Sequence, residues 1–367
     1  MRILTFLHSF EPGGVERVAL RLNRAWLAAG IDAVVVMGRG DGAMAGEATD
    51  IPYHRLSSGR IPTAFWETTW MIVSLPRFVR RTQPDVLFCA GNTYSIVAVA
   101  LKLILGKQCP PIVAKISNDL VRNDMPTPVR RGYRLWCRFQ SRFIDHFIGM
   151  AAPMRAEMAD ILAVADSRIS IICDPAISAR SIVAHARLSA TGPGRRYVGA
   201  GRLSQQKNFA LLIDAFAKIA TPSDHLTIFG EGSERPALER RIRRLGLERQ
   251  VAMPGFVESI VPALQSADVF VLSSDYEGVP AVIVEALATG IAIVATDCSV
   301  SMRDMLDGGA LGSLVPPGDC DALAAAMANI AIGSEQVAAR QEKAGHFTIE
   351  HAALAYVYVL RAVAGKA

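Results

Sequence analysis

The sequence lacks the cysteine spacing of a zinc site or a disulfide framework. Its 367 residues include six cysteines, and these are scattered, with no C-x-x-C pair and no histidine pattern nearby. Metal sites and the disulfides of small domains use short, regular spacings. We therefore expect reduced thiols in a cytoplasmic protein.

The sequence also lacks a hydrophobic run long enough to cross a bilayer. The most apolar stretches, residues 95–105 and 281–296, are interrupted by Lys102 and Glu285 and fall short of the roughly 20 residues that a transmembrane helix needs. Residues 1–7 carry one arginine and a short apolar run, without a small-residue cleavage site. This is typical of a first buried strand and not of a signal peptide. At most, we expect peripheral attachment to the inner face of the cell membrane.

The sequence does contain enough apolar material for two domains. Hydrophobic residues make up 51% of the chain and charged residues 20%. A chain of this length normally divides into domains of roughly 150 to 200 residues. The net charge of +5 suits a phosphate ligand or an anionic lipid surface as partner.

Two series of short β-branched runs alternate with segments of helix length, such as 15–29. This alternation is typical of doubly wound parallel sheets, so the two series predict two Rossmann-like domains of α/β class. The first series of predicted strands is 2–7, 32–37, 85–89, 111–116, 143–149 and 169–173, and the second is 197–200, 225–229, 251–253, 269–272, 291–295 and 312–315.

The alternating pattern dissolves between the two series into Ser, Ala, Arg, Gly and Pro. Such composition marks a loop. We therefore predict an N-terminal domain over 1–178, a linker over 179–196 and a C-terminal domain over 197–345. Residues 346–367 contain a predicted terminal helix.

Residues 273–280 follow an apolar strand and lead into a predicted helix, 281–289. A turn with Gly and Pro before a helix presents free backbone N–H groups to an anion, so a diphosphate would fit there. Glu277 lies just before this helix, and Glu285 lies two turns further along between apolar flanks. A carboxylate can accept hydrogen bonds from two sugar hydroxyls at once. The alternative for either residue is a favourable charge at a helix start or a solvated surface charge.

A second group of polar residues follows the first strand of the second series. Gly201 allows a turn, and Arg202 and Lys207 place two cations before the predicted helix 209–219. Such cations hold a pyrophosphate by charge-assisted hydrogen bonds, although cations and glycines are also common in ordinary loops. Gly13 and Gly14, after the first strand, lack the full G-x-G-x-x-G fingerprint and fit a simple turn equally well.

Together these segments resemble the family 4 glycosyltransferases, which are retaining enzymes of GT-B fold. Residues 277–285 match the family's E-x7-E motif, and 201–203 with 207–208 match its GRL…KN phosphate loop. The matching N-terminal turn, G-x-G segment and base-contacting loop are residues 13–17, 229–232 and 255–257. The resemblance covers nearly the full length. It implies two Rossmann-like domains that face across a cleft, with the terminal helix crossing back to the first domain.

The resemblance implies a role for each matched residue. Arg202 and Lys207 would neutralise the diphosphate of a UDP- or GDP-sugar donor, Glu277 would hold the transferred sugar, and Glu285 would hold the ribose. No cofactor and no metal ion is implied. The leaving diphosphate gathers negative charge, so the two cations would matter most in the transition state. The remaining donor contacts would come from Gly13, Gly14, Gly201, Gly230, Phe256, Val257, Gly278, Val279 and Pro280.

One position departs from the family pattern. Many relatives place a histidine near the donor sugar, after the strand that corresponds to residues 111–116, whereas Asn118 and Asp119 stand here. Either side chain could hydrogen-bond the sugar as a substitute for the histidine. Asn-Asp after a strand is also ordinary turn chemistry.

The acceptor side is indicated by arginines at every fourth residue: Arg130, Arg134, Arg138 and Arg142, with aromatic residues between them. Such a helix would have a basic face flanked by aromatics, which is typical of a segment lying on anionic lipid. A solvated basic face with its aromatics in the core is the alternative. We predict peripheral membrane binding and a lipid-linked glycan acceptor, in cell-surface polysaccharide or lipopolysaccharide assembly.

Three other functions remain open at this point. A non-catalytic sugar-nucleotide or membrane-binding module would keep the fold and bind the donor without turnover. A sugar-nucleotide epimerase would isomerise the donor without an acceptor. Nucleic-acid binding through the arginine-rich segment would give steep salt dependence, but no recognition motif supports it, and we expect no nucleic-acid partner.

Overall fold

The computed structural model describes residues 1–10, 14–42, 46, 50–56, 66–117, 120–121, 126–182 and 194–365. The chain forms two compact units. Unit 1 comprises Met1–Pro175 together with Ile349–Ala367, and unit 2 comprises Ala176–Thr348. The residues predicted as a linker, 179–196, include the 3-10 turn Ala179–Ser181 and the first residue of a strand, Arg196, and residues 183–193 lie outside the described residues.

Unit 1 is built on a seven-stranded sheet in the order β3-β2-β1-β4-β5-β6-β7, and every neighbouring pair is parallel. The strands are β1 Arg2–Leu7, β2 Asp32–Met37, β3 Tyr53–Arg55, β4 Val86–Cys89, β5 Ile112–Lys115, β6 His146–Gly149 and β7 Ile169–Ile171. The order reverses between β1 and β4, which gives this sheet a topological switch point.

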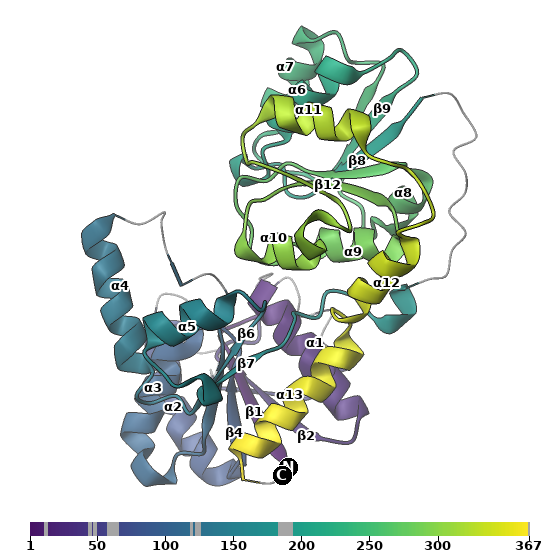
Figure 1. The fold of residues 1–367 in the computed structure, drawn as a ribbon. Helices are drawn as coiled ribbons and strands as arrows, with labels where there is room; N and C mark the ends of the chain where they lie inside the picture. Colours follow the sequence, from purple (N-terminus) through teal and green to yellow (C-terminus); the bar gives the residue numbers. More distant parts are fainter. Residues whose placement is uncertain are drawn as a thin grey trace. The chain divides into compact units, whose positions relative to one another are not determined.

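Helices cover both faces of this sheet. Figure 1 shows α1 (Gly14–Ala28) and α13 (Ile349–Val363) on one side, where Trp26 Nε1 donates a 3.1 Å hydrogen bond to the Ala353 carbonyl. The other side carries α2 (Glu67–Thr82), α3 (Ser95–Leu105), α4 (Thr127–Gln140) and α5 (Met154–Leu162). Trp26 is fully buried, so the last helix of the chain completes the core of unit 1.

Unit 2 repeats the architecture with a six-stranded parallel sheet in the order β10-β9-β8-β11-β12-β13. The strands are β8 Arg196–Ala200, β9 His225–Phe229, β10 Val251–Gly255, β11 Val269–Leu272, β12 Ala292–Thr296 and β13 Ser313–Val315, and the helices are α6 Phe209–Ile219, α7 Arg235–Arg244, α8 Val261–Ser266, α9 Ala281–Thr289, α10 Val300–Met305, α11 Cys320–Asn329 and α12 Val337–Gly345. Here the order reverses between β8 and β11.

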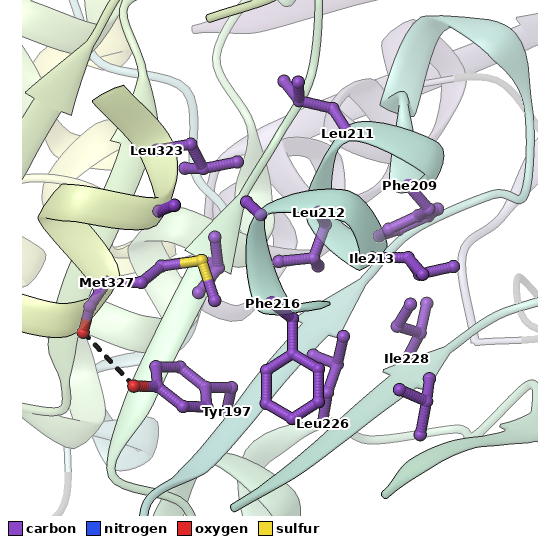
Figure 2. Close-up of a cluster of buried hydrophobic side chains, with 14 of the residues drawn as sticks. Tyr197, Phe209, Leu211, Leu212, Ile213, Phe216, Leu226, Ile228, Leu323 and Met327 are labelled. Atoms are coloured by element: carbon purple, nitrogen blue, oxygen red, sulfur yellow. Dashed lines mark hydrogen bonds between the residues drawn. The ribbon is translucent and has the colours of Figure 1, made fainter. Parts of the chain in front are cut away.

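One core of unit 2 lies where α6 and α11 pack on the sheet (Figure 2). Phe216 of α6 meets Tyr197 of β8 edge to face at 5.7 Å, and the Tyr197 hydroxyl donates to the Met327 carbonyl of α11. Burying that hydroxyl therefore leaves no unpaired donor. Leu212, Leu226 and their neighbours in this cluster are fully buried, so the helix layer is fixed to the strands below it.

The predicted fold class, two Rossmann-like parallel α/β sheets, is confirmed. Twelve of the strands lie on the predicted runs, with ends shifted by at most three residues. The sequence analysis missed β3, whose residues Tyr53 to Arg55 are all exposed. An exposed edge strand buries no apolar run, so it leaves no hydrophobic pattern to detect.

Candidate active site

The loops that follow the strands of unit 2 meet at one edge of its sheet. All six strands are parallel, so their carboxyl ends lie on the same side. Ligands of open α/β sheets bind outside these ends, at the point where the strand order reverses. In unit 2 that point lies between the loop after β8, which carries Arg202 and Lys207, and the loop after β11, which carries Glu277.

The loops after β8, β9 and β10 are joined by backbone hydrogen bonds. Gly201 N donates to the Phe229 carbonyl, and Gly230 N donates to the Gly255 carbonyl at 2.8 Å. Gly230 has φ +134, and a Cβ there would lie 1.9 Å from the Gly201 carbonyl oxygen. Only glycine fits such a contact, so the predicted donor-binding glycines 201 and 230 serve to bring two loops together.

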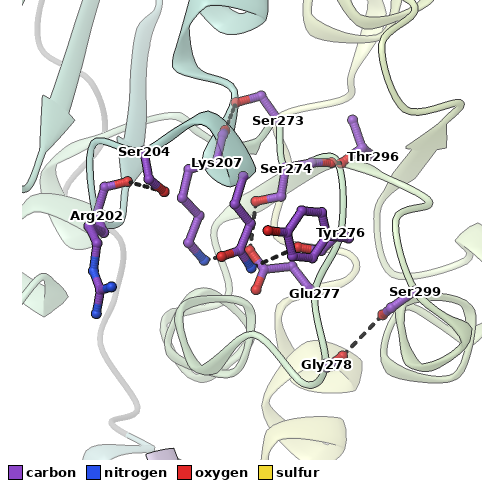
Figure 3. A network of polar contacts seen from close by, with 11 residues as sticks. Arg202, Ser204, Lys207, Ser273, Ser274, Tyr276, Glu277, Gly278, Thr296 and Ser299 are labelled. Atoms are coloured by element: carbon purple, nitrogen blue, oxygen red, sulfur yellow. Dashed lines mark hydrogen bonds and ion pairs between the residues drawn. The ribbon is translucent and has the colours of Figure 1, made fainter. Parts of the chain in front are cut away.

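Lys207 and Glu277 form an ion pair across the switch point (Figure 3). The Lys207 ammonium donates to Glu277 Oε1 at 2.5 Å, and the Ser274 hydroxyl donates to the same oxygen at 2.7 Å. The side chains are 18% and 8% exposed for Lys207 and Glu277. Within the part of the chain that the structure describes, no residue donates to Glu277 Oε2. The pair is therefore partly open to a ligand.

Further hydrogen bonds tie the two loops together around this ion pair. Asn208 Nδ2 donates to Asp275 Oδ1 at 2.8 Å, and the Gln206 side chain donates to the Tyr276 carbonyl at 2.9 Å. The Ser273 hydroxyl donates to the Lys207 carbonyl. These contacts hold Lys207 and Glu277 close together, although 70 residues separate them in sequence.

Arg202 adds a second cation to this edge. Its side chain is exposed, and among the described residues no carboxylate pairs with it. Figure 3 shows Arg202 and Lys207 leaving the same loop with their charged ends toward the same side. The arrangement presents a free guanidinium and a partly exposed ammonium to an anion.

The segment from Gly278 to Pro280 leads into α9. The Gly278 carbonyl accepts hydrogen bonds from the hydroxyls of Ser299 and Ser301, and no side chain caps the helix at Pro280. The first N–H groups of α9, and the positive end of its dipole, are therefore available to an anion.

The other predicted residues of unit 2 lie at the same edge. Val279 stands within the loop before α9, and Glu285 lies half-buried one turn after exposed Ala281, on the same side of the helix. Phe256 and Val257 follow β10, with Phe256 largely exposed. The structure thus brings every predicted donor-binding residue of unit 2 to the carboxyl ends of β8 to β11.

Three predicted residues cannot be placed. Gly13, Asn118 and Asp119 lie outside the described residues, and Gly14 is the first residue of α1. Just before position 118, Ser117 N donates to Asn92 Oδ1 at 3.1 Å.

Unit 1 also has a polar cluster at its switch point, which the sequence analysis missed. The Tyr94 hydroxyl donates to Glu16 Oε1 at 2.5 Å and accepts a long hydrogen bond from His8 N. Burial lowers the pKa of the His8 imidazole, and the nearby Glu16 carboxylate partly offsets this. His8 directly follows β1, Glu16 lies in α1 and Tyr94 lies in the turn after β4, so no local sequence pattern connects them.

Ser274 and Asn208 of unit 2 lie inside the segments that the sequence analysis singled out, but no role was predicted for their side chains. Ser274 precedes Glu277 by three residues, within reach of its carboxylate in a tight turn, and Asn208 directly precedes α6, where its side chain accepts a hydrogen bond from Leu211 N. Both positions could have been singled out as a turn residue and a helix cap. Their hydrogen-bond partners in the neighbouring loop could not have been predicted, because no local pattern marks them.

One pair of acidic residues in the described ranges has the spacing of a metal-binding motif, but both have structural partners. An Asp-x-Asp pattern occurs at 319–321, but Asp319 caps α11 by accepting from Ala322 N, and Asp321 pairs with Lys218. No group of three His, Cys, Asp or Glu residues in the described ranges is placed to hold a metal ion. Likewise, none of the helices described is long and apolar enough to span a bilayer.

The predicted basic helix of unit 1 is α4. Arg138 is exposed, Arg134 forms a 3.0 Å ion pair with Asp160 of α5, and Arg130 is half-buried. The helix ends at Gln140, so the prediction that Arg142 belongs to it is wrong; Arg142 is exposed in the turn that follows. Cys137 is buried on the inner side of this helix.

Two Rossmann-like units, with two cations beside a carboxylate at the switch point of the second, are typical of GT-B architecture. Two family models match the chain one after the other: Glycosyltransferase Family 4 over residues 12–175 and Glycosyl transferases group 1 over residues 194–331. The chain belongs to the family 4 glycosyltransferases.

Individual relatives agree with this assignment. The lipopolysaccharide core biosynthesis glycosyltransferase LpsE of Rhizobium meliloti is 25% identical over 356 residues, which cover 94% of this chain and 93% of LpsE. Two solved structures share the fold at 19% identity: apo WaaB, a lipopolysaccharide outer core galactosyltransferase, with a TM-score of 0.77 over 99% of both chains, and Anabaena HepE in complex with UDP and glucose, with a TM-score of 0.77 over 99% of this chain and 100% of HepE.

Proposed function

We propose that this protein transfers a hexose or N-acetylhexosamine from a UDP- or GDP-sugar to a glycan acceptor, with retention of the anomeric configuration. We further propose that the acceptor is lipid-linked and that the product belongs to a cell-surface polysaccharide or lipopolysaccharide. Similarity to LpsE and WaaB, two glycosyltransferases of the lipopolysaccharide core, favours such a product, and the UDP complex of HepE favours a nucleotide-sugar donor.

The observation that carries this proposal is the Lys207–Glu277 pair beside Arg202. A nucleotide-sugar donor has a diphosphate next to a sugar, so its site needs cations and a hydroxyl acceptor side by side. Arg202 and Lys207 supply the cations. Glu277 Oε2 faces no donor among the described residues and would accept from a sugar hydroxyl.

The spacing of the strands suits the rest of the donor. Neighbouring strands lie about 4.8 Å apart, so the loop after β10 lies about 10 Å from the loop after β8, since β9 lies between them. A base bound at Phe256 and Val257 would leave its ribose and diphosphate directed toward Arg202 and Lys207. Glu285 would hold the ribose.

In the reaction, the bond between the anomeric carbon and the diphosphate oxygen breaks, and a bond to the acceptor oxygen forms on the same face. The departing diphosphate takes the acceptor proton, so the products are a nucleoside diphosphate and a glycoside. Charge collects on the leaving oxygen, where Arg202, Lys207 and the start of α9 stabilise it. These fixed charges would replace a metal ion, and we therefore expect activity to persist in excess chelator.

The test is a screen of UDP-glucose, UDP-galactose, UDP-GlcNAc, UDP-GalNAc and GDP-mannose by thermal shift and by slow donor hydrolysis. One donor should raise the melting temperature, and Lys207→Ala and Glu277→Gln should lose its hydrolysis. Lys343→Ala is the matched control, because Lys343 is also 18% exposed and pairs with Asp307 before β13, away from the carboxyl ends.

The same screen separates the alternatives. A donor that binds without hydrolysis or transfer would favour a non-catalytic module, and an isomerised donor without acceptor would favour an epimerase. If no nucleotide sugar shifts the melting temperature, or if both site variants behave as Lys343→Ala does, the assignment of this site is wrong. The anomeric proton coupling of the glycoside product then tests retention.

A further inference from the structure

Helix α3 presents an apolar face to solvent. It has eleven residues and a single charged one, Lys102. Val97, Ala98 and Leu101 are buried against the sheet, while Ile96, Leu103 and Ile104 on the outer side are exposed. A surface helix normally carries polar residues on its outer side, so this face is unusual for a helix in contact with water.

The helices on both sides of α3 extend this apolar face. Helix α3 packs against α2 and against α4, and Figure 1 shows the three helices on the same side of the sheet of unit 1. Val73 of α2 and Leu135 of α4 are each 68% exposed. We name the exposed apolar residues of these helices the α2–α4 face; they are Val73, Ile96, Leu103, Ile104, Val129, Leu135 and Phe139.

The charges on the three helices of the α2–α4 face are almost all positive, and two of the cations pair with aspartates outside these helices, Lys102 with Asp145 and Arg134 with Asp160. The three helices contain eight lysines and arginines and one carboxylate, Glu67, which lies at the start of α2 and pairs with Arg39. The exposed arginines among them are Arg77, Arg80, Arg81, Arg131, Arg134 and Arg138. Such a surface would repel another positively charged surface of the same kind, so a second copy of this face is an unfavourable partner.

An apolar surface flanked by arginines matches the surface of an anionic bilayer. The apolar side chains can enter the acyl region, and the arginines can reach the phosphates beside them, because their long stems cover apolar surface while the guanidinium stays at the headgroup level. Each cation near an anionic leaflet contributes to binding. Large exposed apolar patches on a protein commonly mark sites that contact a membrane or another protein.

We propose that the α2–α4 face of unit 1 docks on an anionic lipid bilayer, with Leu103 and Leu135 entering the acyl region and Arg131 and Arg138 contacting headgroup phosphates. This surface is wider than the single basic row on α4, because α3 adds three exposed apolar residues to it and α2 adds Val73. Docking of this kind would hold the enzyme where a lipid-linked acceptor lies, and that consequence rests on the proposed function.

The experiment is flotation of the full chain with vesicles of phosphatidylcholine alone and with 30% phosphatidylglycerol. We expect binding to the anionic vesicles, weakened by salt. Leu103→Asp with Leu135→Asp should reduce the partition constant by about tenfold or more, and Leu103→Ala with Leu135→Ala should reduce it less. Arg131→Glu with Arg138→Glu should reduce it by at least about tenfold, and only on anionic vesicles.

The matched control is Leu354→Asp. Leu354 is 71% exposed on α13, on the opposite side of the same sheet, and its change should leave vesicle binding intact. Failure of wild type to bind anionic vesicles would overturn the proposal, as would an equal loss in the Leu354 variant. If the leucine variants instead convert a dimer into a monomer in sedimentation, the face joins two copies and the proposal is wrong.

Donor hydrolysis in solution separates this proposal from the proposed function. Hydrolysis needs no membrane, so the leucine and arginine variants should retain it. Conversely, Glu277→Gln should lose hydrolysis and keep vesicle binding. Loss of both properties in the leucine variants would point to unfolding, which the melting temperature of each variant detects, and the leucine-to-alanine pair then carries the test.

Discussion

Each unit places a lysine–carboxylate pair at the carboxyl ends of its strands, but the two pairs differ in their access to solvent. In unit 1, Lys115 at the end of β5 donates to Asp174 at 2.7 Å, and the side chains are 1% and 18% exposed. In unit 2, Lys207 pairs with Glu277 at 2.5 Å, and the side chains are 18% and 8% exposed. The lysine is therefore sealed in unit 1 and partly exposed in unit 2.

The surroundings of the two lysines explain this difference. Lys115 is the last residue of β5, an inner strand of its sheet. Its partner Asp174 lies close to Tyr356 of α13, and the pKa of Tyr356 is raised well above its usual range, first by burial and then by the Asp174 carboxylate. Lys207 lies in a loop beside glycines and beside exposed Arg202. A ligand could reach the ammonium of Lys207 but not that of Lys115. We therefore expect the first pair to stabilise the fold, and we propose the second for donor binding.

The largest expected effect is on the stability of unit 1. Lys115→Met should lower the free energy of unfolding by about 3–5 kcal/mol, because it leaves the largely buried Asp174 carboxylate unpaired. Denaturant unfolding measures this. The double variant Lys115→Met with Asp174→Leu should recover most of the loss. A single variant as stable as wild type would contradict the structural role of this pair.

The next effect is on turnover in unit 2. Lys207→Ala should lower kcat by about 10²–10³-fold, since it removes a cation from the developing charge of the leaving diphosphate. Its melting temperature should change far less than that of Lys115→Met. Steady-state kinetics and thermal unfolding of both variants give the comparison. If Lys207→Ala loses stability and keeps kcat, the two pairs have the opposite roles.

A smaller effect should follow from Ser274→Ala. Ser274 donates to the Glu277 oxygen that also accepts from Lys207, and a hydrogen bond to a charged group contributes about 1.5–3 kcal/mol. Turnover should therefore fall about tenfold to a hundredfold. Ser266→Ala serves as control, because Ser266 only bonds the Ala263 carbonyl of its own helix. Equal kinetics for the two variants would show that the Ser274 hydroxyl does not contribute to turnover.

The smallest effect concerns pH and belongs to unit 1. Burial lowers the pKa of His8 and of His146 below 6.5, so the unfolded chain binds protons that the folded chain does not. The free energy of unfolding should be constant above pH 6.5 and fall as the pH drops below that value. Melting temperatures from pH 8 to 5.5 test this.

Substitutions sharpen the pH prediction. His8→Gln should flatten the fall, whereas a change at the exposed His225 of unit 2 should not. An unchanged slope in His8→Gln would show that His8 does not carry this dependence.

Most of the fold could be predicted because the parallel strands are buried on both faces and read as continuous apolar runs. The donor motifs could be found because each occupies one contiguous stretch, as with Glu277 before α9. The bonds from Gln206 and Asn208 to the next loop could not be found, since they join segments about 70 residues apart.

The contribution of α3 to the α2–α4 face was missed for a different reason. The apolar run 95–105 predicts burial, and the sequence does not show that Ile96 and Leu103 lie on the outer side of the helix layer. Periodicity identifies which residues share a side of a helix, but α3 is apolar on nearly every side. Only the packing of α3 against the sheet decides which residues remain outside.

Amide hydrogen exchange with and without saturating UDP or GDP tests most directly the claim that unit 2 binds the nucleotide diphosphate. We predict slower exchange in peptides covering residues 201–208 and 273–284 in wild type and in Lys343→Ala, with the protection lost in Lys207→Ala. Protection confined to unit 1, with these two segments unchanged at saturating nucleotide, would contradict the account.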